Sequence, residues 1–255
     1  MAPRKSKKKT RKRAAAPARI LAIDIGGTGL KAAIVSPAGK MLTGKRRIKT
    51  PYPCPPAAMI EALLGLVAPL KKYDRIAIGF PGVVRGDIVL TAPHFGTREW
   101  ARFPLGKVMS RELGGAPARV INDAEMQGLA VIAGKGLELV LTLGTGAGTA
   151  LFRDGELMPH LELAHHPVHG KKTYNEYVGD SALKKIGAQR WNRRVAKVID
   201  ILETLLNYDH LFIGGGNARK ITLTLPGNVS LVSNKAGLEG GGPLWRQPRR
   251  NRTSA

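Results

Sequence analysis

The sequence predicts an α/β protein built from two similar lobes with a cleft between them. Each half of the chain opens in the same way: an apolar strand runs into a glycine-rich turn and a second strand follows, at residues 20–35 and again at residues 139–152. Segments in which apolar residues recur at helical spacing come after both openings. The chain of 255 residues is long enough for two lobes that each bury a core.

The first lobe is expected to span residues 19–122. Pro55-Pro56 suits the start of its first helix, and Gly114-Gly115 suits the end of a later one. The elements expected here are strands at residues 20–23, 30–35, 41–49, 75–80 and 118–121 and helices at residues 57–70 and 103–113.

The second lobe is expected to span residues 123–245 and to repeat the theme. A polar loop with several histidines separates its opening strands from a long amphipathic helical segment. The elements expected here are strands at residues 139–142, 148–152, 156–157, 210–213 and 229–232 and helices at residues 124–133, 181–186, 189–206 and, rich in glycine, from residue 236.

Positive charge dominates the composition and is concentrated at the two ends. The formal net charge is +23; nine basic residues precede the first strand, and four arginines lie between residues 246 and 252. About +10 then remains for the body of the chain, which is therefore basic as well. We expect residues 1–18 to be a disordered basic tail and residues 246–255 to be a basic C-terminal tail. Such charge favours polyanions as partners: nucleic acid, phospholipid surfaces or inorganic polyphosphate.

Other features of the composition exclude several classes of protein. No apolar run is long enough to cross a bilayer, and no apolar stretch follows the basic N-terminus as in a secretory signal, so no membrane partner is expected. Cys54 is the single cysteine, which excludes an intrachain disulfide and a multi-cysteine metal site. Nothing near Cys54 in the sequence activates its thiol. We therefore expect a cytoplasmic protein.

The two glycine-rich turns, residues 24–29 and 143–148, are the first candidates for binding a ligand. Glycine lets backbone N–H groups crowd around an anion because no Cβ keeps them apart, and the hydroxyls of Thr28, Thr142 and Thr145 can add donors. Each turn is equally well explained as a β-hairpin, and a hairpin is compatible with a phosphate cradle. Neither turn matches a P-loop or a convincing dinucleotide fingerprint.

Asn122-Asp123 stands where a strand ends and a helix begins. Asp123 is explained either as a helix N-cap or as a general base, since a carboxylate here can accept the proton of a sugar hydroxyl as it attacks phosphorus. The amide of Asn122 donates and accepts, so it can hold neighbouring hydroxyls. The two roles of Asp123 can coexist.

Glu162 and His165 are candidate sugar ligands because two polar side chains three residues apart can point at one ligand. The alternatives are a capping carboxylate and a solvated histidine. A zinc site at the histidines around residue 165 is disfavoured because no cysteine lies nearby. Gly214-Gly215-Gly216-Asn217 follows an apolar strand and either lets a nucleotide approach the backbone or makes a tight strand-to-helix connection.

Six short motifs follow one another along the chain. They are Asp24-Ile25-Gly26-Gly27-Thr28 with Lys31, Gly79-Phe80-Pro81-Gly82-Val83-Val84, Asn122-Asp123-Ala124, Leu141-Thr142-Leu143-Gly144-Thr145-Gly146, Glu162-Leu163-Ala164-His165 and Gly214-Gly215-Gly216. Taken in this order, they resemble the ROK family of sugar kinases and, within it, the bacterial polyphosphate glucokinases. The similarity spans about residues 19 to 245, and it implies a ribonuclease-H-like ATPase fold of the actin and hexokinase type, in which two lobes close on a hexose.

The resemblance also implies a role for each matching residue. Asp123 would act as general base toward the 6-hydroxyl of the sugar, with glucose the first candidate, and Asp24 would orient Mg²⁺ through water, so that no residue is a direct structural metal ligand. Asn122, Glu162 and His165 would hold sugar hydroxyls, with Gly82 and His94 beside them. Gly26, Gly27, Thr28, Lys31, Thr142, Gly144, Thr145 and Gly146 would bind the phosphates of ATP or polyphosphate, and Gly214, Gly215, Gly216 and Asn217 would face adenosine.

The chain departs from the family pattern at several points. Many members carry a cysteine-rich zinc motif after the histidine; this chain does not, so no zinc is expected. Ala164 replaces the glycine of the usual Glu-x-Gly-His, and His94 stands where sugar-binding members often have asparagine. Both positions bear on which hexose is accepted.

Two alternatives to a kinase belong to other functional classes. ROK regulators carry a helix-turn-helix ahead of the sugar lobes, and residues 1–18 are too short and too basic for one. Nonspecific tethering to nucleic acid by the tail stays open. A non-catalytic sugar-binding protein is disfavoured because Asp123 and both turns are present. A homodimer is expected, as in many relatives.

Overall fold

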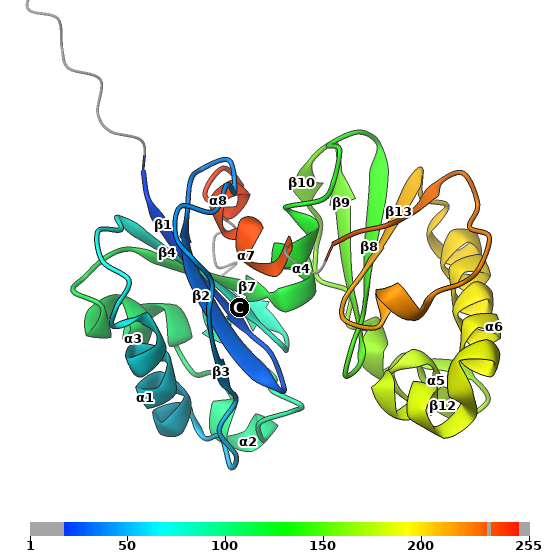
Figure 1. Ribbon diagram of the computed structural model, residues 1–255, viewed down its shortest axis with the longest axis horizontal. Helices are drawn as coiled ribbons and strands as arrows, with labels where there is room; N and C mark the ends of the chain where they lie inside the picture. Colours follow the sequence, from blue (N-terminus) through cyan, green and yellow to red (C-terminus); the bar gives the residue numbers. More distant parts are fainter. Residues whose placement is uncertain (1–17, 234–235, 250–255) are drawn as a thin grey trace, which may run out of the picture.

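The computed structural model describes residues 18–233 and 236–249 and consists of two α/β lobes (Figure 1). The first lobe is built on a five-stranded sheet with the order β3-β2-β1-β4-β7. Strands β1 and β2 are antiparallel, whereas β4 runs parallel to β1 and β7 parallel to β4. The strands are β1 (Ile20–Ile25), β2 (Gly29–Val35), β3 (Arg46–Lys49), β4 (Arg75–Phe80) and β7 (Ala118–Asn122).

The second sheet repeats this arrangement strand for strand, in the order β10-β9-β8-β13-β14. Strand β8 is antiparallel to β9 and parallel to β13, so β8, β9 and β13 correspond to β1, β2 and β4. The predicted duplicated α/β architecture with two lobes is therefore confirmed. The strands are β8 (Leu137–Leu143), β9 (Ala147–Arg153), β10 (Glu156–Leu157), β13 (His210–Gly214) and β14 (Val229–Leu231).

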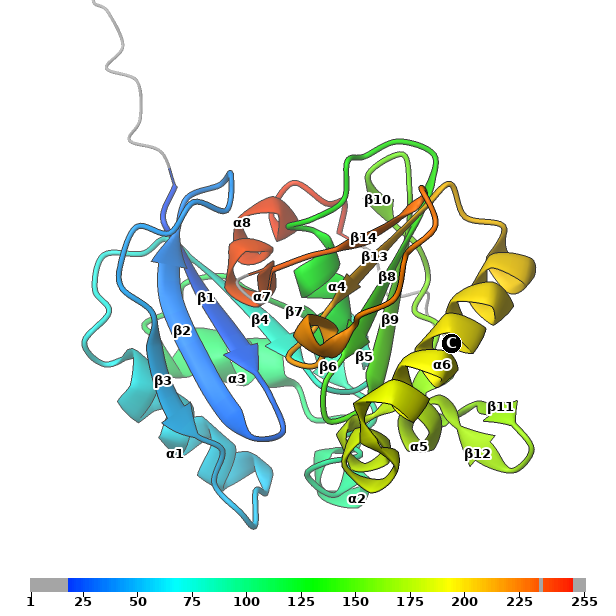
Figure 2. The same cartoon turned by 45° about the vertical axis from the view of Figure 1, so that its right-hand side comes forward.

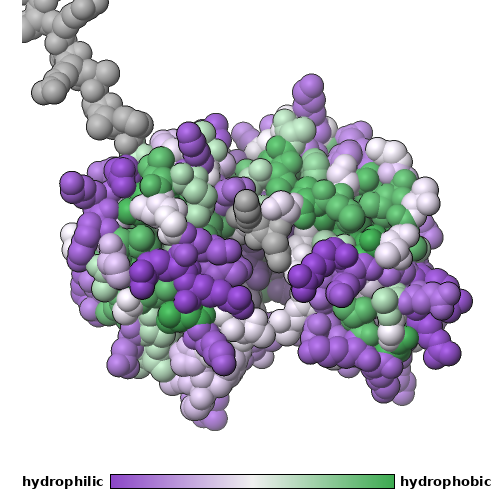
Figure 3. Space-filling view, in the orientation of Figure 1, coloured by the Kyte–Doolittle hydropathy of each residue, from purple (hydrophilic) through white to green (hydrophobic). Residues whose placement is uncertain are grey.

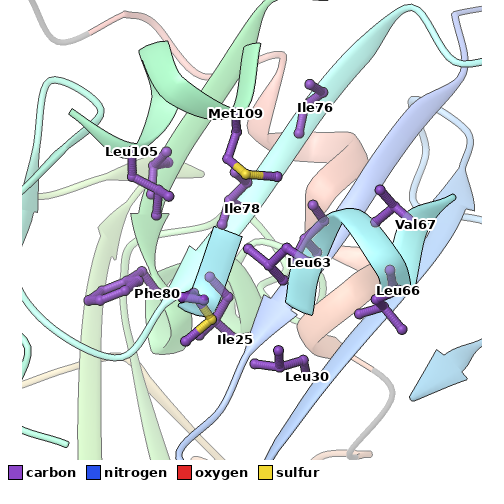
Figure 4. Close-up of a cluster of buried hydrophobic side chains, with 14 of the residues drawn as sticks. Ile25, Leu30, Leu63, Leu66, Val67, Ile76, Ile78, Phe80, Leu105 and Met109 are labelled. Carbon is purple, nitrogen blue, oxygen red and sulfur yellow. The ribbon is translucent and has the colours of Figure 1, made fainter. Parts of the chain in front are cut away.

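The main core of the first lobe lies between its sheet and two helices, α1 (Pro56–Val67) and α3 (Leu105–Glu112) (Figure 4). Pro55 is the N-cap of α1 and Pro56 its first residue, a position that the missing N–H and fixed φ of proline favour. Leu63 and Met109 contribute fully buried side chains from the two helices, and each such side chain stabilises the fold by roughly 1.5–3 kcal/mol. The helices thus hold the sheet in place.

In the second lobe, α5 (Tyr174–Val178) and α6 (Asp180–Leu206) cover the sheet. Trp191 is fully buried, and its indole N–H donates to the carbonyl of Val178 at 2.9 Å. Gly187 has φ +75° and kinks α6, which explains why the sequence predicts two helices with a break there.

The structure differs from the predicted elements at three places. Helix α4 (Asp123–Gly128) ends five residues before the predicted end, and turns lead from it to Gly134 and Gly136, whose φ values are positive. Residue 41 makes only an isolated bridge, so the third strand is confined to β3. The histidine-containing loop is more ordered than expected, because it holds the 3₁₀ helix η1 (Leu163–His165), β11 (Pro167–His169) and β12 (Lys172–Thr173). Further short elements are β5 (Val84–Arg85), β6 (Ile88–Val89), α2 (Thr97–Trp100) and η2 (Ala218–Lys220).

The last two helices return to the first lobe. Helices α7 (Ala236–Glu239) and α8 (Gly241–Leu244) lie beside β1 in both views of the chain (Figures 1 and 2). A Cβ at Gly241 would lie 2.8 Å from the Cβ of Ala22, so only glycine lets α8 pack this closely on the sheet. The expected second lobe, residues 123–245, thus ends in a segment that packs on the first sheet.

The remaining expectations concern the thiol, the membrane and the tails. Cys54 is a buried free thiol whose pKa is raised by burial. In the described part of the chain, no helix combines the length and the apolar character that crossing a bilayer requires. Residues 1–17 and 250–255, to which most of the expected tails belong, lie outside the described residues.

Candidate functional site

A pocket of about 560 Å³ lies between the two lobes, where the carboxyl ends of β1, β4, β8 and β13 approach one another. Hydrophilic side chains border the gap between the lobes (Figure 3). Every residue that the sequence singles out for substrate or phosphate binding lines this pocket, except Gly214. Those that line it are Asp24, Gly26, Gly27, Thr28, Lys31, Gly82, His94, Asn122, Asp123, Thr142, Gly144, Thr145, Gly146, Glu162, His165, Gly215, Gly216 and Asn217.

The first glycine turn is a hairpin between β1 and β2, closed by a hydrogen bond from the N–H of Gly26 to the carbonyl of Gly29. Two of its carbonyls accept hydrogen bonds from side chains: the hydroxyl of Thr50 donates to Gly26 and that of Tyr52 to Gly27, each at 2.6 Å. Within the described ranges, the N–H groups of Gly27 and Thr28 have no partner. The turn therefore offers two free N–H donors to a ligand, whereas the carbonyls of Gly26 and Gly27 already accept hydrogen bonds.

The second turn is the matching hairpin between β8 and β9. The carbonyl of Gly144 accepts from the N–H of Asp180 at 2.9 Å and from the side chain of Asn217 at 3.2 Å. The side-chain oxygen of Asn175 accepts from the N–H of Ala147 at 2.7 Å. Three segments from elsewhere in the second lobe thus fix this turn, and both hairpin predictions are confirmed.

The two turns meet across the cleft. A Cβ placed on Gly27 would lie 3.7 Å from the ring of His94 and 3.9 Å from the hydroxyl of Thr145. The absence of a side chain at Gly27 therefore leaves open the space between the first turn, the second turn and His94. A small anionic group that enters there is reached by N–H groups from both lobes.

Asp24 lies in the pocket at the carboxyl end of β1, with its side chain 14% exposed, and pairs with Lys31 of β2 at 2.7 Å. A Cβ on Gly237 of α7 would lie 3.0 Å from the Asp24 carboxylate, so the returning helix packs tightly against this side chain.

Asn122, not Asp123, is the N-cap of α4. Its Oδ1 accepts from the N–H groups of Ala124 and Glu125, and its Nδ2 donates to the carbonyl of Gly82 at 3.2 Å. The capping alternative for Asp123 was therefore wrong, because the residue before it takes that position. The side chain of Asn122 is largely committed to this frame, although it lines the pocket.

Asp123 is the first residue of α4, and its carboxyl group lies in the pocket. Burial, assisted by the negative charge of Asp24, raises the pKa of Asp123 to about 7, and the N–H of Ala124, 2.9 Å from Oδ1, opposes the rise only in part. A carboxylate with a pKa near neutrality can take a proton from an alcohol more readily than an ordinary aspartate can.

Glu162, His165 and His94 line the pocket near one another, since the charges of Glu162 and His165 act on His94, and together they form the polar wall of the pocket. Burial raises the pKa of Glu162, but the hydrogen bond and charge of His160 outweigh it, and the pKa lies below its usual value. Burial lowers the pKa of His94, and the charge of His165 lowers it further, against the opposing charge of Glu162. The polar wall therefore offers both hydrogen-bond acceptors and hydrogen-bond donors to a ligand in the pocket.

Several other residues of the site carry no recognisable pattern in the sequence. His160 bridges Glu125 and Glu162 beneath the polar wall. Gln127, one helical turn after Asp123, lines the pocket with a buried Nε2 that has no partner within the described ranges, and it packs against Gly214, which explains why Gly214 lies under the pocket rather than in its wall. Of these features, only the Asn122-x-x-Glu125 capping pattern is recognisable in the sequence. Further lining residues are Lys45, Arg47, Pro81, Pro93, Ala147, Gly148, Ala164, Asn175, Asp180 and Gly237.

Comparison with known proteins agrees with this geometry. The model of the ROK family matches residues 20–173. The chain is 32% identical over 213 residues to a polyphosphate glucokinase of Mycobacterium tuberculosis, a match that covers 80% of each protein. Its structure is similar to that of an inorganic polyphosphate/ATP-glucomannokinase from Arthrobacter sp. strain KM, with a TM-score of 0.81 at 28% identity over 90% of this chain and 100% of the other.

A second solved structure supports the fold. A ROK family glucokinase from Streptomyces griseus, in complex with glucose and AMPPNP, is similar with a TM-score of 0.76 at 20% identity, over 91% of this chain and 100% of the other. The two-lobed α/β fold of the hexokinase and actin type is thereby confirmed. The chain belongs to the ROK family.

Proposed function

We propose that this protein transfers a phosphoryl group from polyphosphate or ATP to the 6-hydroxyl of a hexose, glucose being the first candidate. The observation that carries the proposal is the position of Asp123: a carboxyl group of raised pKa lies in the same pocket as two hairpin turns with free N–H groups. The names of the relatives, polyphosphate glucokinase and polyphosphate/ATP-glucomannokinase, point to the same reaction.

In the proposed reaction, Asp123 accepts the proton of the sugar hydroxyl while the oxygen of that hydroxyl attacks phosphorus. Glu162, His165 and His94 hold the other hydroxyls, so that the attacking oxygen faces the donor. Asn122 contributes by fixing the start of α4, which sets the direction of the Asp123 side chain. Holding both reactants in line supplies a large share of the rate in phosphoryl transfer.

The donor phosphates are expected between the two turns. The N–H groups of Gly27, Thr28, Thr145 and Gly146 and the hydroxyls of Thr28, Thr142 and Thr145 would neutralise charge on the phosphoryl oxygens. Lys31 adds a cation on the first-lobe side. Gly215, Gly216 and Asn217 line the second-lobe side, where adenosine would lie when ATP is the donor.

A magnesium ion fits the acidic part of the pocket. Asp24 and Asp123 lie close enough that the charge of the first raises the pKa of the second, and a hydrated divalent cation beside Asp24 would relieve that repulsion. When bound, it would neutralise charge on the donor phosphates. Within residues 18–233 and 236–249, no cluster of three or more histidine, cysteine, aspartate or glutamate side chains could itself hold a metal, and we propose no zinc site.

The cations at the mouth of the pocket favour a polyanionic donor. Lys45 and Arg47, from the edge of the first sheet, line the pocket together with Lys31. A polyphosphate chain is longer than the triphosphate of ATP, and each additional contact with a cation releases counterions. We therefore propose that polyphosphate is used as well as ATP.

A coupled assay tests the proposal. Purified protein with Mg²⁺ is given a panel of hexoses and either ATP or long-chain polyphosphate, and the phosphorylated carbon is identified by NMR. We expect a hexose 6-phosphate. Absence of product with every combination of hexose and donor would refute the proposal.

Two further properties, the compartment and the oligomeric state, are proposed. The only cysteine is a buried free thiol, which suits a reducing cytoplasm. We also propose a homodimer, as the resemblance to the family implies; light scattering coupled to gel filtration measures it, and a monomer at assay concentrations would contradict it.

A further inference from the structure

His160 is a half-buried ionisable residue to which the proposed reaction assigns no role. It lies between β10 and η1 with a side-chain exposure of 12%, and it does not line the pocket. Its ring joins two carboxylates from different parts of the chain. One belongs to α4, the helix that begins at Asp123, and the other belongs to the polar wall of the pocket.

Both ring nitrogens face a carboxylate oxygen. Nδ1 lies 3.0 Å from Oε1 of Glu125, and Nε2 lies 3.3 Å from Oε2 of Glu162. An ionised carboxylate only accepts hydrogen bonds, and a neutral imidazole carries one N–H and one lone pair. A neutral ring would therefore turn a lone pair toward one of the two anions, whereas the imidazolium donates to both.

The surroundings of His160 support the charged form. Burial alone would lower its pKa, but the hydrogen bonds and charges of Glu125 and Glu162 raise the pKa to about 9. Glu125 comes from α4 and Glu162 from the segment of His160 itself; His165 lies near enough to act on Glu162. His160 is thus expected to be charged at neutral pH.

Glu125 connects His160 to the start of α4, where Asp123, the proposed general base, lies. The second oxygen of Glu125, Oε2, accepts from the backbone N–H of Asn122 at 3.0 Å and closes the capping box of α4. Asp123 follows Asn122 directly. A continuous set of hydrogen bonds therefore runs from Glu162, through His160 and Glu125, to the start of the helix that carries Asp123.

We propose that His160, as an imidazolium, is a positioning residue for the acceptor sugar. It fixes Glu162 relative to Asp123 and keeps Glu162 ionised, so that Glu162 accepts hydrogen bonds from sugar hydroxyls. This assignment rests on the proposed function, because it takes the polar wall to be the hexose side of the pocket. It adds a determinant of acceptor affinity that does not touch the substrate.

The test compares His160→Ala with His166→Ala, a matched change at an exposed histidine of the same segment that does not line the pocket. For His160→Ala we expect the KM for the hexose to rise roughly 10- to 100-fold, the range for loss of a hydrogen bond to a charged group. The KM for the donor should stay within about twofold. Added imidazole should restore hexose affinity, because it can enter the space left by the ring. His166→Ala should change neither constant.

Two readouts separate this role from a merely structural one. In the wild type, kcat/KM for the hexose should fall as pH rises through about 9, where His160 loses its proton, and His160→Ala should lack this limb. NMR of ¹⁵N-labelled histidine should show His160 as an imidazolium at pH 8, a measurement that needs no activity. Glu125→Gln is the second variant and should shift the alkaline limb to lower pH.

Different experimental results would refute the proposed function and the positioning role of His160. If the wild type phosphorylates no hexose, the proposed function fails, while the NMR result still decides the charge of His160. If the wild type is active but His160→Ala keeps its hexose KM and its alkaline limb, or if His160 is neutral at pH 8, the positioning role is overturned.

Discussion

The two glycine turns occupy equivalent places in the two sheets but carry different chemistry. Asp24 is the penultimate residue of β1 and lies beside Lys31 and Gly79; Thr142 is the penultimate residue of β8 and lies beside Gly148 and Gly214. The first lobe thus places charged groups around its turn, whereas the second lobe places hydroxyls, amides and bare backbone there. The two lobes therefore share the geometry of strand and turn but differ in the polar groups that surround the turn.

The same division continues at the next strands. In the first sheet, β7 ends at Asn122 and Asp123 follows it, while the edge strand β3 adds Arg47 to the lining of the pocket. The second lobe ends β13 at Gly214 and follows it with Gly215, whose φ is +87° and whose Cβ would collide with the backbone of Leu143. We infer that two acidic residues at the end of the first sheet, Asp24 and Asp123, govern turnover, whereas the hydroxyls beside the second turn mainly help to hold the donor.

The largest effect is expected from Asp123→Asn. The change keeps the shape of the side chain but removes the base, so kcat should fall about 10²- to 10⁴-fold, while binding of hexose measured by calorimetry persists. A variant with near-normal kcat would show that Asp123 is not the base and that the acidic residues at the end of the first sheet do not govern turnover in this way.

The comparison is tested most directly by changing the two equivalent residues, Asp24→Asn and Thr142→Val. Asp24→Asn should lower kcat by roughly 10²-fold, because it removes the carboxylate that would orient the Mg²⁺ neutralising charge on the donor phosphates. Thr142→Val removes one neutral hydrogen bond and should cost about 3- to 10-fold, mainly in the KM of the donor. Equal effects on kcat would contradict the division between the lobes.

Asp24→Asn also gives a pH test. In the wild type, kcat/KM should rise with pH through about 7, as Asp123 loses its proton and becomes a base. Removing the negative charge of Asp24 lowers the pKa of Asp123, so this acidic limb should move to lower pH. If the acidic side of the pH profile of kcat/KM does not move in this variant, a group other than Asp123 controls it.

A smaller effect is expected at the edge strand. Arg47→Gln should raise the KM for long-chain polyphosphate roughly 3- to 10-fold and weaken its dependence on salt, with less effect on ATP. Arg46→Gln is the matched control, because Arg46 is a neighbouring exposed arginine of β3 that does not line the pocket. If both variants behave alike, the contribution of β3 is general charge and not a contact at the pocket.

The smallest effect concerns stability. The native state raises the pKa of Asp123 from 3.8 to about 7, so the ionised form is disfavoured in the folded protein, and folding stability is lost as pH rises from about 4 to 7. Asp123→Asn removes this loss. Its Tm at pH 8 should exceed that of the wild type by several degrees, at roughly 2–4 °C per kcal/mol for a chain of this size, with no difference at pH 4. An equal Tm at pH 8 would show that the charge is compensated.

Local patterns predicted most of the elements and most of the pocket. Strands that end in glycine turns, prolines at the start of α1 and the sequence Asn-Asp before a helix are all contiguous features. The return of α7 and α8 to the first sheet was not predictable in this way, since it depends on Gly241 meeting Ala22 and Ala77 from more than 160 residues away. Nor was the role of His160, because a histidine in a polar loop gives no sign of which carboxylates will face it.

The order of apolar runs, turns and polar strand ends determined by itself that this chain forms two equivalent sheets and where each would offer a phosphate-binding turn. Contiguous residues suffice for that, because hairpins and caps are closed by neighbours in the chain. Only the tertiary structure decided which charges face one another across the cleft: Asp24 with Asp123, and His160 with Glu125 and Glu162. Burial and proximity between distant segments set those energies, and a linear pattern contains neither quantity.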